Sequence, residues 1–417
     1  MKKYFLSFGL LLTVALTTTV FNSCGDNDDN DKKDKNAKLS KLDISNSTAL
    51  FIAPSNSSLK SAGQTNRLFK VTNNGVVKEV SYLDEAGNPI TETFVPEMLY
   101  VIANSDYFVA KLNYSTYLLR KSDGAVFALN ASLGDIWNSG NRTGGYVNAD
   151  FIVQDANKNL YFINEMKGRV YKLDVSNPNS ITSSPVTPDT ESAWDFTVSA
   201  KGDVFYSTNN VFRVAKSKGG LYNIPYNGIT LNSWTGLDGK IRYAIGSNTL
   251  YTVNIEENGN ASIDEKTLNF QLGPLYHPVH MLRFNNRVIL LMESLSYPIQ
   301  EVENELNAPR PIGLSYNIST IKKATNSEKY YYLSGLNSSQ QPFLIKVNPA
   351  NDAVTELLNI GDYDIYAMTV SKDDELIFNA LRMSDGVKII GKISSTGNLQ
   401  IIDTQINSEV TVLERIQ

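Results

Sequence analysis

Short β-prone segments recur along this chain at a nearly constant interval, and this spacing constrains the fold more than any other feature. Runs rich in Val, Ile, Tyr, Phe, Leu and Thr each end in Asn, Asp, Gly or Ser, whereas apolar patterns with a period of 3.6 residues are scarce. Ala193 to Tyr206 (AWDFTVSAKGDVFY) aligns without a gap on Ile365 to Phe378 (IYAMTVSKDDELIF). The offset of 172 residues divides into four steps of 43, so we predict an all-β chain built from repeats.

The segments between and before these two supply the other copies. A unit of one turn and one strand recurs at Ala49 to Ile52, Asp106 to Val109, Asn159 to Phe162, Asp203 to Tyr206, Lys240 to Tyr243, Arg287 to Leu291, Lys329 to Leu333 and Glu375 to Phe378. The Asn, Asp and Gly residues of the turns tolerate the positive φ of tight hairpins. Four short strands and three turns in about 43 residues match one blade of a β-propeller.

Residues 40 to 417 accommodate eight such units, so we predict a single eight-bladed propeller domain; seven blades with a large insertion is the alternative. The first unit lacks an innermost strand before Ala49, and Val410 to Ile416 is left over after the last unit. The C-terminal strand is therefore predicted to complete the first blade and close the ring, which removes exposed sheet edges. The pattern is weakest at 130 to 147 and at 292 to 316, where Glu301 to Arg310 interrupts it.

This repeat resembles the broad class of β-propellers that includes the quinoprotein-like and NHL-like groups. No WD dipeptide or kelch double glycine recurs in phase, so the resemblance names no subfamily. Propellers host binding modules and enzymes alike, and the resemblance therefore implies a fold and not an activity.

The N-terminus has the pattern of a lipoprotein signal peptide over residues 1 to 23. Lys2 and Lys3 precede an uncharged and mostly apolar run from Tyr4 to Val20, which is shorter than the roughly 20 residues that span a bilayer. The only cysteine, Cys24, stands where cleavage after Ser23 would expose it for lipidation, so we predict a membrane anchor there. A free cysteine beside an ordinary cleavage site is the alternative.

Residues 24 to 39 are predicted to form a disordered acidic tether, because their mixture of Asn, Asp and Lys buries little apolar surface. The acidic residues are Asp26, Asp28, Asp29 and Asp31. Over residues 21 to 31 the segment resembles the surface-export signal of Bacteroidetes-type outer-membrane lipoproteins. That resemblance implies an outer-membrane lipoprotein exposed at the cell surface; a location on the periplasmic face is the alternative.

Several classes of function are excluded by composition. The net charge is −5 without a basic stripe, which excludes nucleic acid as a partner. No glycine-rich phosphate loop and no calcium loop is present, so we expect no cofactor. A lipidated Cys24 cannot act as a nucleophile, and no Gly-Xaa-Ser-Xaa-Gly elbow is found.

The candidates for chemistry are few. The only histidines, His277 and His280, are separated by Pro278 in a loop context, so we expect no metal site and exclude metal-dependent propeller lyases, which need several histidines. Asp150 and Asp195 occupy matching positions in consecutive repeats and are weak candidates for a catalytic carboxylate pair. The alternative is a repeated aspartate that caps a turn.

Aromatic residues give the strongest indication of binding. Trp194, Trp234 and Tyr366 are predicted to lie where the chain enters the first strand of a blade, at the mouth of the central channel. Aromatic faces anchor sugar rings and apolar ligands efficiently. Further candidates for the rim of the mouth are Trp137, Arg142, Tyr146 and His280. The alternative is that these rings fill the packing between blades.

These observations favour a monomeric, non-enzymatic surface module that captures a ligand such as a glycan, or docks a transporter-associated protein, at the channel mouth. A carbohydrate-active enzyme (glycosidase or lyase) with paired carboxylates and a structural scaffold of the envelope are the alternatives.

Overall fold

Every regular element in the described part of the chain is a β-strand. The computed structural model describes residues 41–54, 66–96, 98–101, 105–112, 115–128, 152–164, 168–176, 181–193, 195–208, 211–227, 232–245, 248–272, 278–292, 298–371, 373–406, 408–410 and 413–416. These residues belong to the unit Leu39–Gln417. Their strands form eight antiparallel four-stranded sheets and one two-stranded hairpin.

The first four sheets, given from the inner to the outer strand, are as follows. Blade 1 is β34 (Leu413–Arg415), β1 (Ser47–Pro54), β2 (Asn66–Thr72) and β3 (Val77–Glu79). Blade 2 is β6 (Met98–Val101), β7 (Tyr107–Leu112), β8 (Ser115–Arg120) and β9 (Val126–Ala128). Blade 3 is β10 (Ile152–Gln154), β11 (Leu160–Asn164), β12 (Arg169–Asp174) and β13 (Thr182–Pro185). Blade 4 is β14 (Asp195–Val198), β15 (Val204–Thr208), β16 (Val211–Ala215) and β17 (Leu221–Asn227).

The remaining four sheets follow the same order. Blade 5 is β18 (Asn232–Thr235), β19 (Ile241–Ile245), β20 (Thr249–Ile255) and β21 (Ala261–Thr267). Blade 6 is β22 (Pro278–Phe284), β23 (Arg287–Met292), β24 (Ile299–Asn304) and β25 (Arg310–Ile312). Blade 7 is β26 (Ile318–Asn326), β27 (Tyr331–Asn337), β28 (Pro342–Asn348) and β29 (Ala353–Glu356). Blade 8 is β30 (Tyr363–Val370), β31 (Leu376–Arg382), β32 (Val387–Ile393) and β33 (Leu399–Asp403), and the hairpin β4 (Ser81–Leu83) and β5 (Pro89–Thr93) lies between blades 1 and 2 in sequence.

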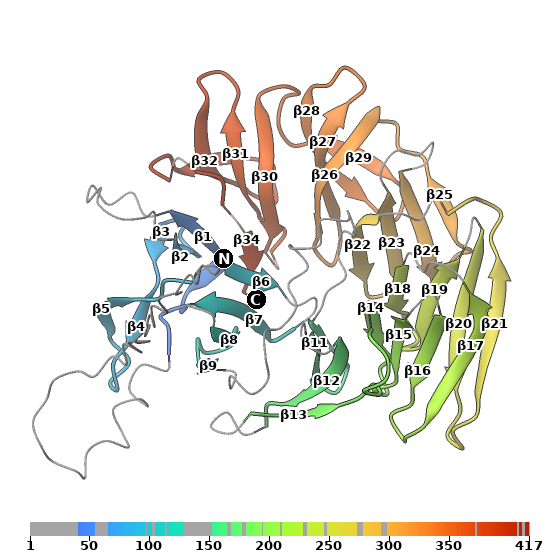
Figure 1. The fold of residues 1–417 in the computed structure, drawn as a ribbon. Helices are drawn as coiled ribbons and strands as arrows, with labels where there is room; N and C mark the ends of the chain where they lie inside the picture. Colours follow the sequence, from blue (N-terminus) through green and yellow to red (C-terminus); the bar gives the residue numbers. More distant parts are fainter. Residues whose placement is uncertain are drawn as a thin grey trace, which may run out of the picture. The chain divides into compact units, whose positions relative to one another are not determined.

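The sheets follow one another around a ring, with first strands such as β22, β26 and β30 towards its middle (Figure 1). The prediction of an eight-bladed propeller is thus confirmed. The positions of the predicted turn-and-strand units are confirmed as well, since all eight units fall on the second strands of the blades. Apolar clusters extend across neighbouring blades; one of them joins Leu282 of blade 6 to Leu333 of blade 7.

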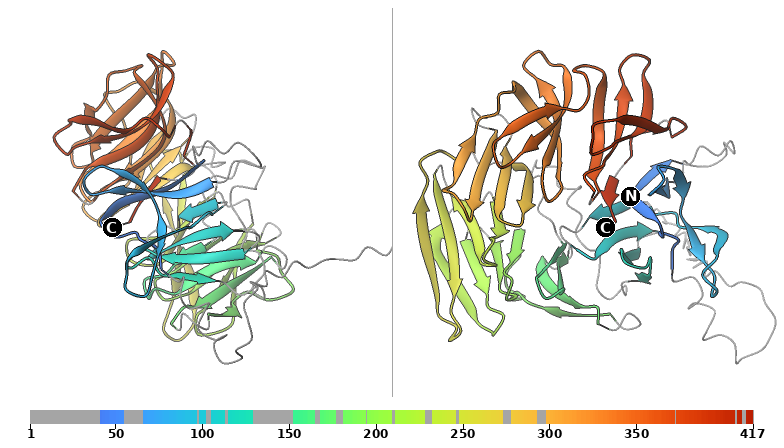
Figure 2. Two further views of the ribbon diagram at one scale, coloured as in Figure 1. Left: turned by 90° about the vertical axis from the view of Figure 1, so that its left-hand side faces the viewer. Right: turned by 180° about the vertical axis from the view of Figure 1, so that it is seen from behind.

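The predicted closure of the ring is also confirmed. The C-terminal strand β34 is the innermost strand of blade 1 and pairs antiparallel with β1, with Leu50 opposite Glu414. Seen from behind, this last strand lies beside the beginning of the domain (Figure 2). Closure therefore depends on a noncovalent ladder between the two ends of the domain.

The two aligned sequence segments have the same local structure. Ser199 and Ser371 each begin the turn between the first and second strands, and their hydroxyls accept bonds from backbone N–H groups two and four residues later. Asp155 occupies the same place in blade 3, where its Oδ1 accepts bonds from the N–H groups of Asn157 and Asn159. The repeated position of these short polar side chains is thus explained by their role in capping the first turn of a blade.

One expectation was wrong. The interval from Glu301 to Arg310 was predicted to break the strand pattern, but β24 continues to Asn304 and β25 begins at Arg310. The pattern looked broken because Gln300, Glu301 and Glu303 are buried polar residues within a strand.

Candidate ligand-binding site

The first strands of all blades begin at the same face of the ring, which we call the entrance face. In blades 2 to 8 the first strand runs from the side of the preceding blade towards the first turn of its own blade, and in blade 1 this place is taken by β34, which follows blade 8 in sequence. The third strand of an antiparallel blade runs parallel to the first and therefore begins at this face too. Side chains near the starts of first and third strands can consequently meet there.

The first strands of blades 6, 7 and 8 differ from the other first strands that the structure describes. Their ladders with the second strands shift register between Pro278 and His280, between Ile321 and Lys323, and between Ile365 and Ala367. The described innermost ladders of blades 1 to 5 show no such shift. Such a bulge inserts one unmatched residue and redirects side chains. The inserted residue of blade 8 is Tyr366, and blade 7 has two shifts, which insert Ser319 and Lys322.

The bulge in blade 7 requires a glycine on the opposite strand. A Cβ atom at Gly335 would lie 1.8 Å from the backbone oxygen of Thr320, so no side chain fits there. The glycine in the sequence Tyr331 to Asn337 (YYLSGLN) is thus explained by the close approach of the bulged strand.

A row of polar contacts crosses the three bulged strands. His280 Nε2 of β22 lies 3.4 Å from the backbone oxygen of Lys322 on β26. Lys322 Nζ in turn donates to the two carboxylate oxygens of Asp364 on β30, at 2.8 and 3.1 Å. The side chains of Lys322 and Asp364 are 34% and 25% exposed, so both are partly accessible to solvent.

The row continues into the segment that closes the ring. Tyr366 is half-buried, and Lys388 Nζ at the start of β32 lies 5.7 Å from the centre of its ring. The same ammonium group lies 3.7 Å from Oε1 of Glu409, which follows β33 and is 62% exposed. We call His280, Lys322, Asp364, Tyr366, Lys388 and Glu409 the entrance row.

Burial and neighbouring charge tune two members of the entrance row. Burial lowers the pKa of His280 to about 4, so its imidazole is neutral at neutral pH. Burial also raises the pKa of Tyr366, with smaller contributions from the negative charges of Glu409 and Asp364. The row therefore holds two ammonium groups, two carboxylates, a neutral imidazole and a neutral phenol.

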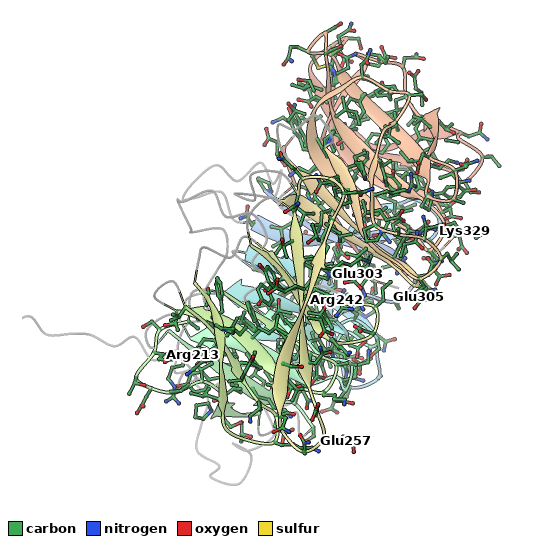
Figure 3. All side chains as sticks on the ribbon, turned by 90° about the vertical axis from the view of Figure 1, so that its right-hand side faces the viewer. Arg213, Arg242, Glu257, Glu303, Glu305 and Lys329 are labelled. Atoms are coloured by element: carbon green, nitrogen blue, oxygen red, sulfur yellow. The ribbon has the colours of Figure 1, made fainter. Side chains whose placement is uncertain are left out.

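Trp234 was predicted to lie at the channel mouth, but it is 2% exposed and belongs to the core. It is the third residue of β18, close to the turn at the opposite face, and its Nε1 donates to Oε1 of Glu303 at 2.6 Å. Arg242 Nε lies 3.6 Å from the same carboxylate oxygen. Figure 3 labels Arg242 and Glu303 close to each other. Trp234 thus fits the alternative of packing between blades.

Most other predicted residues lie outside the part of the chain that the structure describes: Cys24, Trp137, Arg142, Tyr146, Asp150, Trp194 and His277. Of Asp195 the structure describes the backbone, which pairs with Ser207 in the innermost ladder of blade 4. The suggested catalytic pair of Asp150 and Asp195 therefore stays a prediction. Of the predicted binding residues, Tyr366 and His280 belong to the entrance row.

Sequence reasoning missed four residues of the entrance row: Lys322, Asp364, Lys388 and Glu409. A signal was present, since His280, Lys322 and Asp364 are each separated by 42 residues, one blade length. Lys388 and Glu409 carry no such signal, because they come from a third strand and from the closing connection.

Within the described residues, no group of three or more His, Cys, Asp or Glu side chains could hold a metal ion. Over the same residues, the structure contains no helix long and apolar enough to span a bilayer.

No protein-family model matches this chain, and no curated protein matches it. Among solved structures, a streptogramin B lyase is 14% identical, with a TM-score of 0.41 over 73% of this chain and 93% of the lyase. A puromycin hydrolase is 13% identical, with a TM-score of 0.44 over 76% of this chain and 54% of the hydrolase. A candidate 6-phosphogluconolactonase from Bacteroides fragilis is 12% identical, with a TM-score of 0.43 over 89% of this chain and 99% of its own. At such low similarity the fold is established by the chain's own ring of blades, which is an eight-bladed β-propeller.

Proposed function

We propose that this protein is a non-enzymatic lipoprotein of the cell surface that captures a neutral glycan at the entrance face of its propeller. The observation that carries the proposal is the entrance row, in which polar contacts link three bulged strands and the ammonium group of Lys388 lies over the ring of Tyr366 and beside Glu409. Tethering by lipid at Cys24 would hold the propeller domain at the membrane surface.

The balance of charges favours a neutral ligand. The ammonium groups of Lys322 and Lys388 each lie within 4 Å of a carboxylate, that of Asp364 or Glu409. An anionic ligand would be attracted by the lysines and repelled by the acids, and a cationic ligand would meet the reverse. A neutral polyol can accept hydrogen bonds from the ammonium groups, donate hydroxyls to the carboxylates and stack on the phenol ring.

The test is binding of the full chain to immobilised maltohexaose, cellohexaose, xylohexaose and mannohexaose, with a sialylated and an aminated oligosaccharide for comparison. We expect saturable binding to at least one neutral sugar, weakened about tenfold by Tyr366→Ala because one stacking contact contributes on the order of 1.4 kcal/mol.

Tyr330→Ala is the matched control. Its ring also carries a lysine, with Lys346 Nζ 4.8 Å from the ring centre, but it lies next to the turn at the opposite face of blade 7. Equal losses in the two variants, or no sugar binding by the unaltered chain, would refute the proposal. Cleavage of the bound sugar would instead identify a carbohydrate-active enzyme.

A further inference from the structure

The entrance row includes a residue from the segment that closes the ring. This closing segment comprises the described residues 404–406, 408–410 and 413–416, and it ends in β34. Glu409 belongs to it, whereas Tyr366 and Lys388 belong to blade 8. The site thus extends across the place where the two ends of the domain join.

A buried asparagine holds Glu409 in place. Asn379 of β31 is fully buried, and its Oδ1 accepts a bond from the N–H of Val410 at 3.1 Å. Its Nδ2 donates to the backbone oxygens of Ile389 at 3.0 Å and of Ser408 at 3.5 Å. Both chain neighbours of Glu409 are therefore bonded to one side chain of blade 8, which makes Asn379 a positioning residue.

The joint itself is short. β34 pairs with β1 over three residues, Leu413 to Arg415, and the N–H of Ile416 donates to the oxygen of Thr48 at 3.1 Å. Apolar packing adds to this ladder, because Leu413 and Val410 share a cluster with residues of β1 and blade 8 such as Phe51 and Ile390. A ladder of only three residue pairs opens more readily than the longer ladders of the domain.

From these contacts we infer that ligand binding at the entrance face and closure of the ring are coupled: a neutral glycan that contacts Tyr366, Lys388 and Glu409 binds the closed ring and stabilises the docking of β34. The physical reason is linkage, since a ligand that needs both sides of the joint has lower affinity for the open form. The inference rests on the proposed function and specifies how that site is assembled.

The experiment measures backbone amide exchange of the full chain with and without the best-bound neutral hexasaccharide of the panel above. At saturation we expect exchange in Leu413–Arg415 and in the paired residues of β1 to slow by about tenfold, equivalent to about 1.4 kcal/mol of coupling. Unchanged exchange at saturation would overturn the coupling and leave the proposed function intact. If no sugar binds, both proposals are overturned.

Two variants separate the closing segment from the rest of the row. Glu409→Gln alters an exposed side chain and should abolish the slowing of exchange even at saturating sugar. Lys322→Gln is the matched control, because Lys322 lies in the row but outside the closing segment. Lys322→Gln should lower the affinity for the sugar, while saturating sugar still slows amide exchange in β34. Slowed exchange in Glu409→Gln and unchanged exchange in Lys322→Gln would contradict the coupling.

Asn379→Ala tests the positioning role. The losses of affinity caused by Asn379→Ala and by Glu409→Gln should be non-additive, because both variants remove the same carboxylate from its place beside Lys388. A purely structural role of Asn379 would give additive losses and would overturn this assignment.

Discussion

Burial keeps the imidazole of His280 uncharged, and this has a consequence for stability. The folded pKa of about 4 lies below the ordinary value of 6.5, so the unfolded chain binds more protons between these two values. The free energy of unfolding should therefore fall as the pH drops from about 6.5 towards 4. Above about pH 6.5 the imidazole is neutral in both the folded and the unfolded chain, so it no longer lowers the free energy of unfolding.

We expect His280→Gln to flatten this pH dependence by on the order of 2 kcal/mol across the window, because the amide can keep a polar contact with the Lys322 oxygen without taking up a proton. Urea unfolding at several pH values, followed by circular dichroism, measures the difference between the two chains. Parallel curves for the two chains would show that His280 does not titrate as proposed.

The two aromatic residues, Trp234 and Tyr366, show how far residue-level reasoning reaches. The repeat phase placed both where the chain enters a first strand, whereas Trp234 is the third residue of β18 and Tyr366 is the fourth residue of β30. The repeat phase does not predict which group accepts the hydrogen bond of a tryptophan. The indole N–H of Trp234 donates to Glu303, which lies 69 residues further along the chain. Tyr366 is half-buried and is the residue that a bulge leaves unmatched within the ladder of β30 with β31, which the sequence did not indicate.

At the scale of elements, β24 joins its blade to both neighbours. Its ladder with β23 shifts register between Val288 and Ile289. Glu303 therefore pairs with Val288, and Glu301 pairs with Ile289. Adjacent strand positions face opposite sides of a sheet, and the two carboxylates therefore point in opposite directions. Glu303 accepts bonds from Trp234 and from the N–H of Leu237, both of which belong to blade 5 or its first turn.

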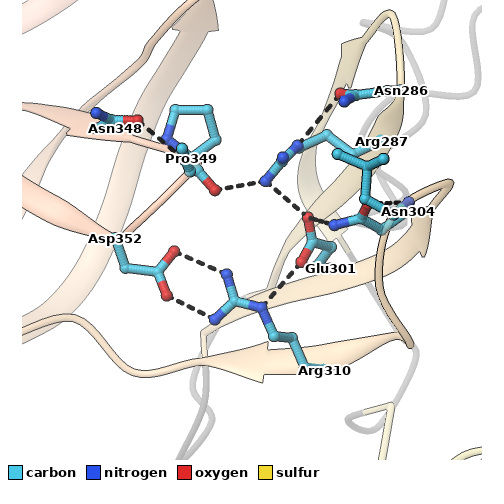
Figure 4. A network of polar contacts seen from close by, with 10 residues as sticks. Asn286, Arg287, Glu301, Asn304, Arg310, Asn348, Pro349 and Asp352 are labelled. Atoms are coloured by element: carbon cyan, nitrogen blue, oxygen red, sulfur yellow. Dashed lines mark hydrogen bonds and ion pairs between the residues drawn. The ribbon is translucent and has the colours of Figure 1, made fainter.

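Glu301 is fully buried on the other side of the same strand. It accepts bonds from Arg287 at 3.1 Å and from Arg310 at 3.0 Å (Figure 4). Arg310 also pairs with Asp352 of blade 7, and Arg287 donates to the backbone oxygen of Pro349. One strand thus links three successive blades, which explains why charged residues occupy a strand of the core.

We expect Glu301→Gln to lower the free energy of unfolding by about 3 kcal/mol, because it keeps the shape but leaves buried Arg287 without a charged partner. Asp385→Asn is the matched control, since it breaks an ion pair with Arg382 at the surface and should leave the urea midpoint unchanged. Urea titration of both variants measures the effect. Similar midpoints for the two variants would contradict a stabilising role of the buried network.

At the scale of the whole molecule, the proposed location of the protein depends on the proposed lipid anchor at Cys24. We predict that Cys24→Ser abolishes incorporation of a palmitate analogue and moves the protein from the membrane to the soluble exported fraction, because the chain has no other cysteine. Ser23→Ala is the control and should preserve both the incorporation of the palmitate analogue and the membrane location. Protease added to intact cells distinguishes the surface from the periplasmic face. A Cys24→Ser protein that stays in the membrane would contradict the lipid anchor.

The all-β class, the number of blades and the closing strand could be predicted from the sequence, because strand and turn propensities repeat with the length of a blade and act locally. Which side chains meet became clear from the assembled ring. The bulges in three first strands, the burial of Trp234 beside Glu303 and the meeting of Glu409 with Lys388 depend on which strands and side chains approach in space. The interval of 42 residues between His280, Lys322 and Asp364 is the one mark of the entrance row in the sequence. The fold was therefore predictable from local physics, whereas the entrance row required the ring to be assembled.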